Sequence, residues 1–587
     1  MAKSEKGVSK QTAGKMGLVG AVSVIITSVV GIGIFFKNGG VFKLNNGNCI
    51  GVLVSWVLSA VIAMFTAFAY IEISTSKKTA GTNAGLGGWA GDFVGYNMGR
   101  AVKILMPTWN YGTKCLALAV FAGMAIFNIA FCTRTDAAYG DWYQGNTMLY
   151  STLAGAGLII FFMFLNYFSS KFGDKFSQMS TIIKFIPILI VISIGVAFGM
   201  KNADSGLWKG DIATKTKYSG QFSITGILDS LPAILFAFDG FLIIGNIATK
   251  VDNPRKNVSM SIVIAMIVII ALNLAITVGC ITCGTGNPFE IFKIAFGIKG
   301  VDPETHKIVY TATTLSNVFT ILMASLIAFS AIACVNAYAI AGVDALQDCI
   351  QDESVMLANY FKQIKGGSNL KLSSTLYYAA FLAIFGIVTS IPTCILNTDQ
   401  IWDGLTVVSV VVFFAIYGVV IVGGLTNRRT YRTEVERSKL FVPSAYIGCI
   451  GCFFIAAYSL LYTYLINMFM VTNGQINAMS TFKGWGLSFT PMYMTGGEMK
   501  LPDGSTVLYN GCYFQSWIAA TLFWLLAVLN IVYPFINDVI LLYTNKTYGH
   551  ALMWQKEEAQ GFSIVNTPAP TLPPLIQKKI KKEEAVA

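Results

Sequence analysis

The stretch Thr27-Ser28-Val29-Val30-Gly31-Ile32-Gly33-Ile34-Phe35-Phe36 decides how this chain folds. It lies in the first long apolar run, between Lys15 and Lys37, where an uninterrupted helix is expected. Two glycines within three residues weaken such a helix, because glycine costs about 1 kcal/mol relative to alanine. An apolar medium tolerates unwound backbone only where protein buries it or where it lines a polar cavity. We therefore predict a break at Gly31–Gly33 whose free backbone groups bind a ligand.

The composition is that of a membrane protein. Hydrophobic residues make up 55% of the 587 residues and charged residues 12%, whereas a soluble domain carries about 25% charged residues. Apolar runs of about 20 residues recur along the chain, and each is long enough to cross a hydrocarbon layer about 30 Å thick. Because the runs lack the two-residue alternation of barrel strands, the sequence predicts an all-α membrane protein.

Twelve transmembrane helices are predicted from these runs. They cover roughly residues 16–42, 50–75, 101–130, 148–168, 177–199, 224–248, 259–283, 311–341, 375–396, 402–425, 441–470 and 514–544. Most lysine and arginine residues then fall in segments on one side of the membrane, and this asymmetry places both termini in the cytoplasm. We expect a multi-pass protein of the cell membrane, in contact with lipid. The net charge of +12 reflects this topology, so nucleic acid is not an expected partner.

The cysteines predict neither a metal site nor a disulfide framework. Two pairs have the spacing of zinc ligands, Cys280/Cys283 and Cys449/Cys452. In the predicted topology the first pair lies near the outer face and the second in the inner half of its helix, so the pairs cannot meet. The sequence also lacks a nucleophile–base constellation. We therefore expect no enzyme activity, no cofactor and no metal.

A lysine lies inside the fifth predicted helix. Lys184, in Thr181-Ile182-Ile183-Lys184-Phe185-Ile186-Pro187, is about two helical turns from the membrane edge. An ionisable residue at this depth indicates a functional site whose partner remains to be found. The alternative is a lysine at the inner interface that reaches back to a lipid phosphate.

A second break is predicted in the sixth helix, at Phe236-Ala237-Phe238-Asp239-Gly240-Phe241. Aspartate beside glycine weakens the helix and places a carboxylate in the apolar layer; alternatively, Asp239 caps a local turn. The two breaks lie five helices apart, in helices of opposite orientation. Matching breaks in two five-helix halves are typical of inverted-repeat transporters with a site near the membrane midplane.

This pattern predicts the organisation of the whole chain. A cytoplasmic tail, 1–15, precedes two five-helix repeats, and two further helices and a second tail follow them. The predicted segments are 16–200 for the first repeat, 201–223 for an outer loop, 224–425 for the second repeat, 426–545 for helices 11 and 12 with a long outer loop at 471–513, and 546–587 for a disordered cytoplasmic tail.

Three motifs resemble one known family, the amino acid–polyamine–organocation superfamily. Gly31-Ile32-Gly33-Ile34-Phe35 resembles its helix 1 signature, and Phe236–Phe241 followed by Val251-Asp252-Asn253-Pro254-Arg255 resembles its helix 6 and exit loop. Residues 166–187, with Lys184, resemble its helix 4–5 hairpin. The resemblance covers roughly residues 15–350. It implies a LeuT-like five-plus-five inverted repeat with discontinuous helices 1 and 6, and secondary transport of amino acids.

The resemblance also implies the substrate-binding residues. The substrate carboxylate would meet the N–H groups of Gly31, Ile32 and Gly33, at the positive end of a half-helix. The amino group would meet exposed carbonyl groups in both breaks. These carbonyls belong to Val29, Phe236 and Asp239, with Gly240 completing the second break.

Lys184 matches a helix 5 lysine that, in proton-coupled members of the superfamily, replaces the sodium ion of related transporters. The resemblance implies that its ammonium bridges a helix 1 carbonyl and a helix 8 hydroxyl, for which Ser330 is the candidate. The chain departs from the common pattern at Ile32, where many members have serine, and at Thr249-Lys250, where many have two glutamates. Cytoplasmic closure is therefore expected to use different pairs.

The function expected from the sequence is that of an amino acid permease that works by alternating access and is coupled to protons. Its partners would be an amino acid, protons and membrane lipid. One alternative is a polyamine or other organic-cation carrier, in which Asp239 pairs with an amine of the substrate. Another is an amino acid sensor that binds its ligand without transporting it.

Overall fold

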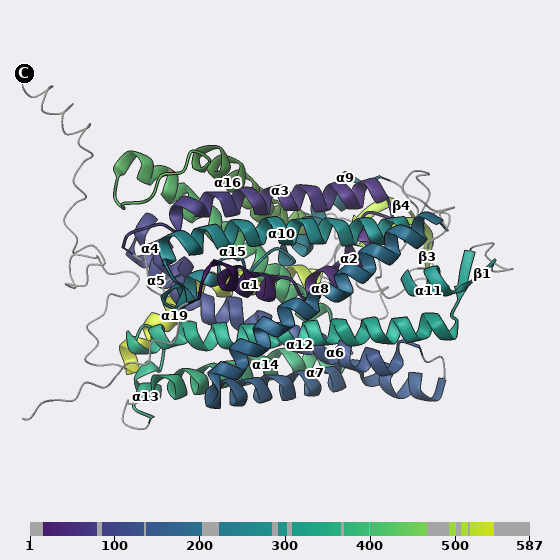
Figure 1. Ribbon diagram of the computed structural model, residues 1–587, viewed down its shortest axis with the longest axis horizontal. Helices are drawn as coiled ribbons and strands as arrows, with labels where there is room; N and C mark the ends of the chain where they lie inside the picture. The colour runs from purple at the N-terminus through teal and green to yellow at the C-terminus, as the bar shows by residue number, and fades with distance from the viewer. Residues whose placement is uncertain are drawn as a thin grey trace, which may run out of the picture.

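A computed structural model gives the fold of the chain. It describes residues 16–78, 85–133, 137–201, 222–283, 291–301, 308–364, 369–397, 399–466, 492–500, 506–514 and 517–544. Long helices lie side by side along the longest axis of the molecule (Figure 1). The tails and most of the two long loops expected at 201–223 and 471–513 lie outside the described residues.

Nine helices of the described residues are long and apolar enough to cross a membrane. Three shorter apolar helices, Leu18–Val29, Ile182–Ala197 and Ile224–Phe236, fall where spans 1, 5 and 6 are expected. The chain is thus a helical multi-pass membrane protein. Large apolar side chains face outward on the surface helices, where lipid would cover them, for example Ile160 on one helix and Ile387 on another.

The first part of the bundle contains the expected break near Gly31. Its elements are α1 (Leu18–Val29), α2 (Ile32–Leu44), α3 (Cys49–Ile73), α4 (Gly85–Phe93), α5 (Tyr96–Leu105), η1 (Met106–Gly112), α6 (Thr113–Phe131), α7 (Ala137–Phe168) and α8 (Ser170–Lys201). Helix α4 is a short additional helix that precedes the third span. The connection between α7 and α8 is a single residue, because α7 ends at Phe168 and α8 begins at Ser170.

The second part contains the break expected near Asp239. Its elements are α9 (Ile224–Phe236), η3 (Ile243–Lys250), α10 (Pro254–Cys283), α11 (Ile291–Phe296), α12 (Thr314–Gln351), α13 (Ala358–Lys362), α14 (Leu370–Leu396) and α15 (Gln400–Thr430). Helix α12 extends ten residues beyond the predicted end of its span at 341. As a result, Asp344 and Asp348 lie on the helix, and Asp352 and Glu353 lie in the turn after it.

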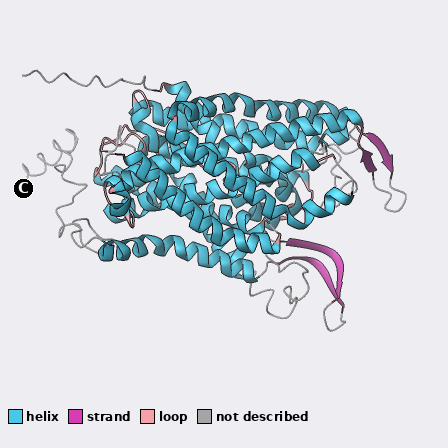
Figure 2. Ribbon diagram, turned by 90° about the horizontal axis from the view of Figure 1, so that it is seen from below, coloured by secondary structure: helices cyan, strands magenta, loops and turns pink. Residues whose placement is uncertain are grey.

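The chain is not entirely helical. Beyond α16 (Phe441–Ala457), η5 (Tyr458–Ile466) and α19 (Trp517–Thr544), it has two small antiparallel hairpins, β1 (Ile298–Val301) with β2 (Ile308–Thr311), and β3 (Met492–Lys500) with β4 (Thr506–Phe514). Figure 2 shows both hairpins at one end of the bundle, outside the helices. The all-α prediction therefore holds for the bundle and fails for these loops.

Polar residues cap several of the long helices. The side chains of Asn48, Ser223 and Asn369 each accept a hydrogen bond from a first-turn N–H group, and Thr313 and Ser316 form a reciprocal capping box at the start of α12. Such caps satisfy donors that have no partner within the helix. Inside the bundle, α12 packs against α6, α8 and α14, and α10 packs against α3, α8 and α1.

Candidate functional site

The first break is confined to two residues. Helix α1 ends at Val29, Val30 is extended (φ −73°, ψ 105°), and Gly31 caps α2 with φ −159° and ψ −135°. The break is thus narrower than the predicted Gly31–Gly33, because Ile32 and Gly33 already belong to the first turn of α2. The N–H groups of a first helical turn have no partner within their helix and lie at the positive end of its dipole.

The second break is wider than its motif suggests. Helix α9 ends at Phe236, a turn occupies Ala237–Leu242, and the chain resumes as the 3₁₀ helix η3 at Ile243. Gly240 has a φ of +97°, a conformation that only glycine adopts without strain. The last carbonyl groups of α9 therefore face the turn rather than a following helical turn.

The two breaks lie against each other at the centre of the bundle. A Cβ atom built on Gly33 would lie 3.1 Å from the Cα atom of Ala237, and one built on Gly240 would lie 3.6 Å from Val29 Cγ2. A Cβ atom on Gly31 would overlap the sulfur of Cys334 on α12. The structure therefore brings together both sequence-predicted breaks, and α12 lies beside them.

Lys184 is buried beside the first break. Its side chain is 1% exposed, and its Nζ donates to the carbonyl oxygen of Thr27 and lies 3.1 Å from the sulfur of Cys334. The alternative of an interfacial lysine that reaches a lipid phosphate is thus wrong. The partner predicted on the eighth span is wrong as well: the α12 group is the Cys334 thiol, and the buried Ser330 hydroxyl has no hydrogen-bond partner.

Ser330 and Cys334 are four residues apart on one helix, so they share a face one turn apart. The sequence motif predicts which face of α12 points toward Lys184, but it does not determine which helical turn lies level with the lysine. Whether Lys184 meets Ser330 or Cys334 depends on the position of α12 along its axis relative to α1, and only tertiary packing sets that position.

Asp239 in the second break is fully engaged by the protein itself. Its Oδ2 forms an ion pair with Nζ of Lys114 on α6, and both side chains are 1% exposed. Its Oδ1 accepts hydrogen bonds from the Tyr417 hydroxyl, at 2.8 Å, and from the N–H of Gly240, at 2.7 Å. Asp239 therefore caps the local turn, which is the alternative role given for it above, and it also forms an ion pair.

Lys114 and Tyr417 are site residues that the sequence alone did not identify. A lysine in the middle of the third span is visible in the sequence and is itself a signal of function. Its partner is not visible, because 125 residues separate Lys114 from Asp239. Tyr417, on α15, has no distinguishing sequence context in an aromatic-rich chain.

Aromatic side chains surround this ion pair. Tyr111, in the π-helical segment η1, accepts a hydrogen bond from Asn246 of η3 and contacts the Tyr338 ring at 6.0 Å between centroids. The Tyr338 hydroxyl would lie 3.0 Å from a Cβ atom on Gly240. One-turn π-helical segments often occur at functional sites. The packing of Tyr111 links η1 to the second broken helix.

A second lysine–aspartate pair lies toward the end of the bundle that carries the hairpins. Lys37 of α2 forms an ion pair with Asp403 of α15 and donates to the Thr406 hydroxyl at 3.0 Å. Its Nζ also lies 5.2 Å from the centre of the Phe236 ring, within the range of a cation–π contact. This pair joins both broken helices to α15.

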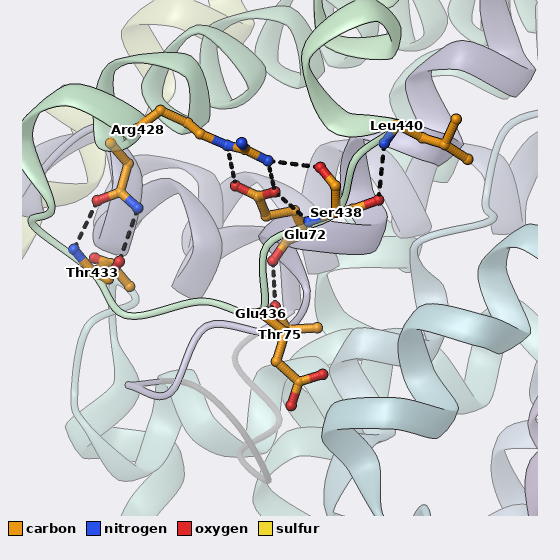
Figure 3. Close-up of polar contacts among 8 residues, drawn as sticks. Glu72, Thr75, Arg428, Thr433, Glu436, Ser438 and Leu440 are labelled. Atoms are coloured by element: carbon orange, nitrogen blue, oxygen red, sulfur yellow. Dashed lines mark hydrogen bonds and ion pairs between the residues drawn. The ribbon is translucent and has the colours of Figure 1, made fainter. Parts of the chain in front are cut away.

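At the opposite end, hydrogen bonds and an ion pair join α15 and the loop after it to the end of α3 (Figure 3). Arg428 binds the carboxylate of Glu72 through two nitrogen atoms and also donates to the carbonyl oxygen of Ser438. The N–H of Ser438 donates to the same Glu72 carboxylate, at 2.9 Å, and the N–H of Glu436 donates to the Thr75 hydroxyl, at 2.9 Å. We call this network the Glu72 clasp.

Other contacts at this end tie further elements together. Arg255, at the start of α10, pairs with Glu436 at 3.0 Å and donates to the carbonyl oxygen of Thr75. Lys250, at the end of η3, pairs with Asp344 of α12 at 2.9 Å. Asp344 thus joins the second broken helix to α12.

The class of protein follows from a family model as well as from this geometry. The model of the amino acid permease family matches residues 16–481, a range that contains both breaks, Lys184 and the Lys37–Asp403 pair. The chain therefore belongs to the amino acid permease family.

Individual relatives are more distant. Amino acid transporter protein 6 of Caenorhabditis elegans is 29% identical over 276 residues, which cover 45% of this chain and 48% of the relative. The serine/threonine exchanger SteT of Bacillus subtilis (strain 168) is 25% identical over 270 residues, which cover 46% of this chain and 54% of the relative. The chain thus spans about half the length of these relatives.

The fold has a counterpart among solved structures. The crystal structure of MhsT in complex with L-phenylalanine matches with a TM-score of 0.52 and 15% sequence identity, over 74% of this chain and 97% of the other. At this level of identity the likeness concerns the fold alone. It agrees with the LeuT-like architecture expected from the sequence.

Proposed function

We propose that the chain is a secondary transporter that moves amino acids across the cell membrane by alternating access. The observation that carries this proposal is the contact between two interrupted helices at the centre of the bundle, where Gly33 meets Ala237 and Gly240 meets Val29. Membership of the amino acid permease family and the transporter names of both relatives support it.

The two breaks offer complementary groups for the backbone of an amino acid. The N–H groups of Gly31, Ile32 and Gly33, at the start of α2, suit a carboxylate. Carbonyl groups of the broken segments suit an ammonium group. In the proposed binding mode these carbonyls are those of Val29, Phe236 and Asp239, and Gly240 permits the close approach of the two segments.

The proposal includes a five-plus-five inverted repeat. Elements α1 to α8 form the first repeat and α9 to α15 the second, and α16 with η5 and α19 supply the two further spans. In the part of the chain that the structure describes, nine membrane-length helices and three shorter apolar ones then make up the twelve transmembrane helices. The first helix of each repeat is the interrupted one, so the breaks occupy corresponding positions in the two halves.

Closure at the two ends would alternate. In the proposed cycle spans 1, 2, 6 and 7 rock against the remaining helices. Lys37–Asp403 crosses that boundary at one end, whereas Lys250–Asp344 and the Glu72 clasp cross it at the other. Each set of contacts must open while the other is closed.

Lys184 is proposed as the group that couples transport to protons. Its ammonium joins α8 to the carbonyl oxygen of Thr27 on α1 and to Cys334 on α12, so it bridges a rocking helix and two helices of the fixed group. A lysine can act there as a permanent cation or as a proton carrier. Ser330, one turn along α12, is retained only as a neighbour of this bridge.

The proposed topology places the end with the Glu72 clasp in the cytoplasm, together with both termini. The abundance of lysine and arginine in the segments at that end supports this orientation. Annular lipid would cover the outward-facing apolar side chains of α7 and α14.

Uptake into proteoliposomes tests the proposal. The purified chain is reconstituted and supplied with labelled amino acids, with and without an inwardly directed proton gradient. We expect saturable uptake of at least one amino acid, stimulated by the gradient. Binding of an amino acid without uptake would instead favour a sensor, and competition by putrescine alone would favour a polyamine carrier.

A further inference from the structure

The Lys114–Asp239 ion pair lies in the second break, where an amine of the substrate is expected to bind. Asp239 directly precedes Gly240, whose neighbours include Val29, the last residue of α1 before the first break. The carboxylate accepts a hydrogen bond from the Gly240 N–H, so it lies at the turn of the second break, close to the end of α1. Both charged side chains are almost completely removed from solvent, at 1% exposure each.

The protein uses both oxygen atoms of this carboxylate. Oδ2 faces the Lys114 ammonium, and Oδ1 accepts hydrogen bonds from Tyr417 and from the N–H of Gly240. An ammonium group of a ligand would have to displace Lys114 or break these bonds. Displacing Lys114 would leave a buried lysine without its counter-ion, which is strongly unfavourable.

We propose, on the basis of the proposed transport function, that this internal pair sets the charge class of the substrate. Lys114 and Asp239 neutralise each other, so the second break presents no net charge to a substrate side chain. The transporter then accepts amino acids with uncharged side chains. It rejects lysine, arginine and polyamines, because their additional ammonium finds no free carboxylate. It disfavours acidic side chains at the second break, because the Lys114 ammonium there is already neutralised.

The other charged groups near the breaks are consistent with this assignment. Lys37 is paired with Asp403 toward the hairpin end. The two partners that the structure gives Lys184, Thr27 O and Cys334 Sγ, are uncharged and lie on the α1–α12 side. Asp239 is thus the carboxylate placed to meet a substrate amine, and the ion pair with Lys114 prevents it from binding one.

Removing one charge at a time tests the proposal. Lys114→Met leaves the buried Asp239 carboxylate without its cation, and we expect the uptake ratio of lysine to serine to rise at least about tenfold. Asp239→Asn keeps the acceptor for Tyr417 and Gly240 but frees the Lys114 ammonium. This variant should raise the ratio of glutamate to serine by a similar factor.

The double variant K114M/D239N restores neutrality and should return both ratios toward those of the wild type. A matched control is the buried Arg100–Asp538 pair between α5 and α19, where Asp538→Asn should leave both ratios unchanged. Thermal unfolding in detergent shows which variants are folded. If the single variants do not fold, the wild type still tests the proposed charge class: lysine, glutamate and putrescine should not compete for serine uptake.

The outcomes separate this inference from the proposed function. Wild-type uptake of lysine or putrescine as efficient as that of serine would overturn the inference and leave amino acid transport standing. Folded single variants with wild-type ratios would also overturn it. If no amino acid of any charge is taken up or bound by the wild type, the proposed function itself fails and the inference with it.

Discussion

Lys37, Lys114 and Lys184 lie inside an apolar bundle, and their partners differ in kind. Lys37 and Lys114 face aspartates, whereas Lys184 is held by a carbonyl oxygen and a thiol. Burying an ammonium in such surroundings is costly unless a specific contact compensates for it. The neutral partners of Lys184 lie on two other helices, so its contribution is to join three helices at the first break.

Lys184→Met tests this role at the scale of one residue. The variant keeps an unbranched side chain and loses both hydrogen bonds, so we expect gradient-driven uptake to fall at least about tenfold. Stimulation by the proton gradient should disappear as well. Uptake at several external pH values in proteoliposomes measures both effects.

Cys334→Ser is the matched control for Lys184, because a hydroxyl still accepts a hydrogen bond from Nζ and is smaller than the thiol that faces Gly31. We expect this variant to retain most of its uptake and its dependence on pH. Unchanged uptake and pH dependence in Lys184→Met would contradict a coupling role for the lysine.

Gly31→Leu tests the first break. A Cβ atom at this position would overlap the Cys334 sulfur, so a larger side chain must push α2 away from α12 and displace the first-turn N–H groups. We expect amino acid binding and uptake to be abolished while the protein remains folded. Scintillation proximity binding of a labelled amino acid gives the measurement.

The control for that variant is Ile32→Ser, which leaves the backbone N–H of residue 32 in place. If the site acts through its backbone, this change should be tolerated, with uptake within about threefold of the wild type. Loss of binding in Ile32→Ser together with retention in Gly31→Leu would argue against carboxylate binding by the start of α2.

At the scale of elements, sequence patterns predicted the existence of both breaks, and packing set their extent. Glycine and aspartate in an apolar run identify a weak point in a helix. The first break is only Val30–Gly31, because α2 can begin as soon as the backbone has changed direction. The second extends over Ala237–Leu242, since contacts of Asp239 and Gly240 stabilise a turn there.

Long-range partners were beyond the reach of the sequence. Lys184 was identified from its depth in a span, but its α12 partner depends on which turn of that helix lies level with it. The Glu72 clasp was not predicted, because it joins residues more than 350 positions apart. Local sequence contains no information on such a pairing.

The Glu72 clasp permits a stability test at this scale. Glu72 is 3% and Arg428 25% exposed, so Arg428→Met leaves a nearly buried carboxylate held by the N–H of Ser438. We expect a loss of about 2–3 kcal/mol, less than for a fully buried pair. Lys77→Met, at the exposed Lys77–Glu434 pair, should cost less than about 1 kcal/mol. Thermal or denaturant unfolding in detergent compares the two; equal losses would show that the clasp adds nothing beyond a surface ion pair.

At the scale of the whole molecule, the two ends of the bundle are closed by different contacts. Lys37 and Asp403 join α2 to α15 at the hairpin end, and Lys250 and Asp344 join η3 to α12 at the other. Both pairs connect a helix proposed to rock with a helix proposed to stay fixed. A transporter that opens each end in turn must therefore break each pair once in every cycle.

Cross-linking tests this requirement. The double variants K37C/D403C and K250C/D344C are cross-linked in proteoliposomes with a bifunctional methanethiosulfonate reagent that spans the length of the replaced lysine side chain. We expect a cross-link at either end to stop uptake and a reductant to restore it. The variant K362C/E353C replaces an ion pair between α13 and the turn after α12, where no rocking helix takes part, so its cross-link should leave uptake largely intact. If uptake continues with either end cross-linked, that pair does not separate during transport. Continued uptake with both ends closed would exclude alternating access by rocking of spans 1, 2, 6 and 7.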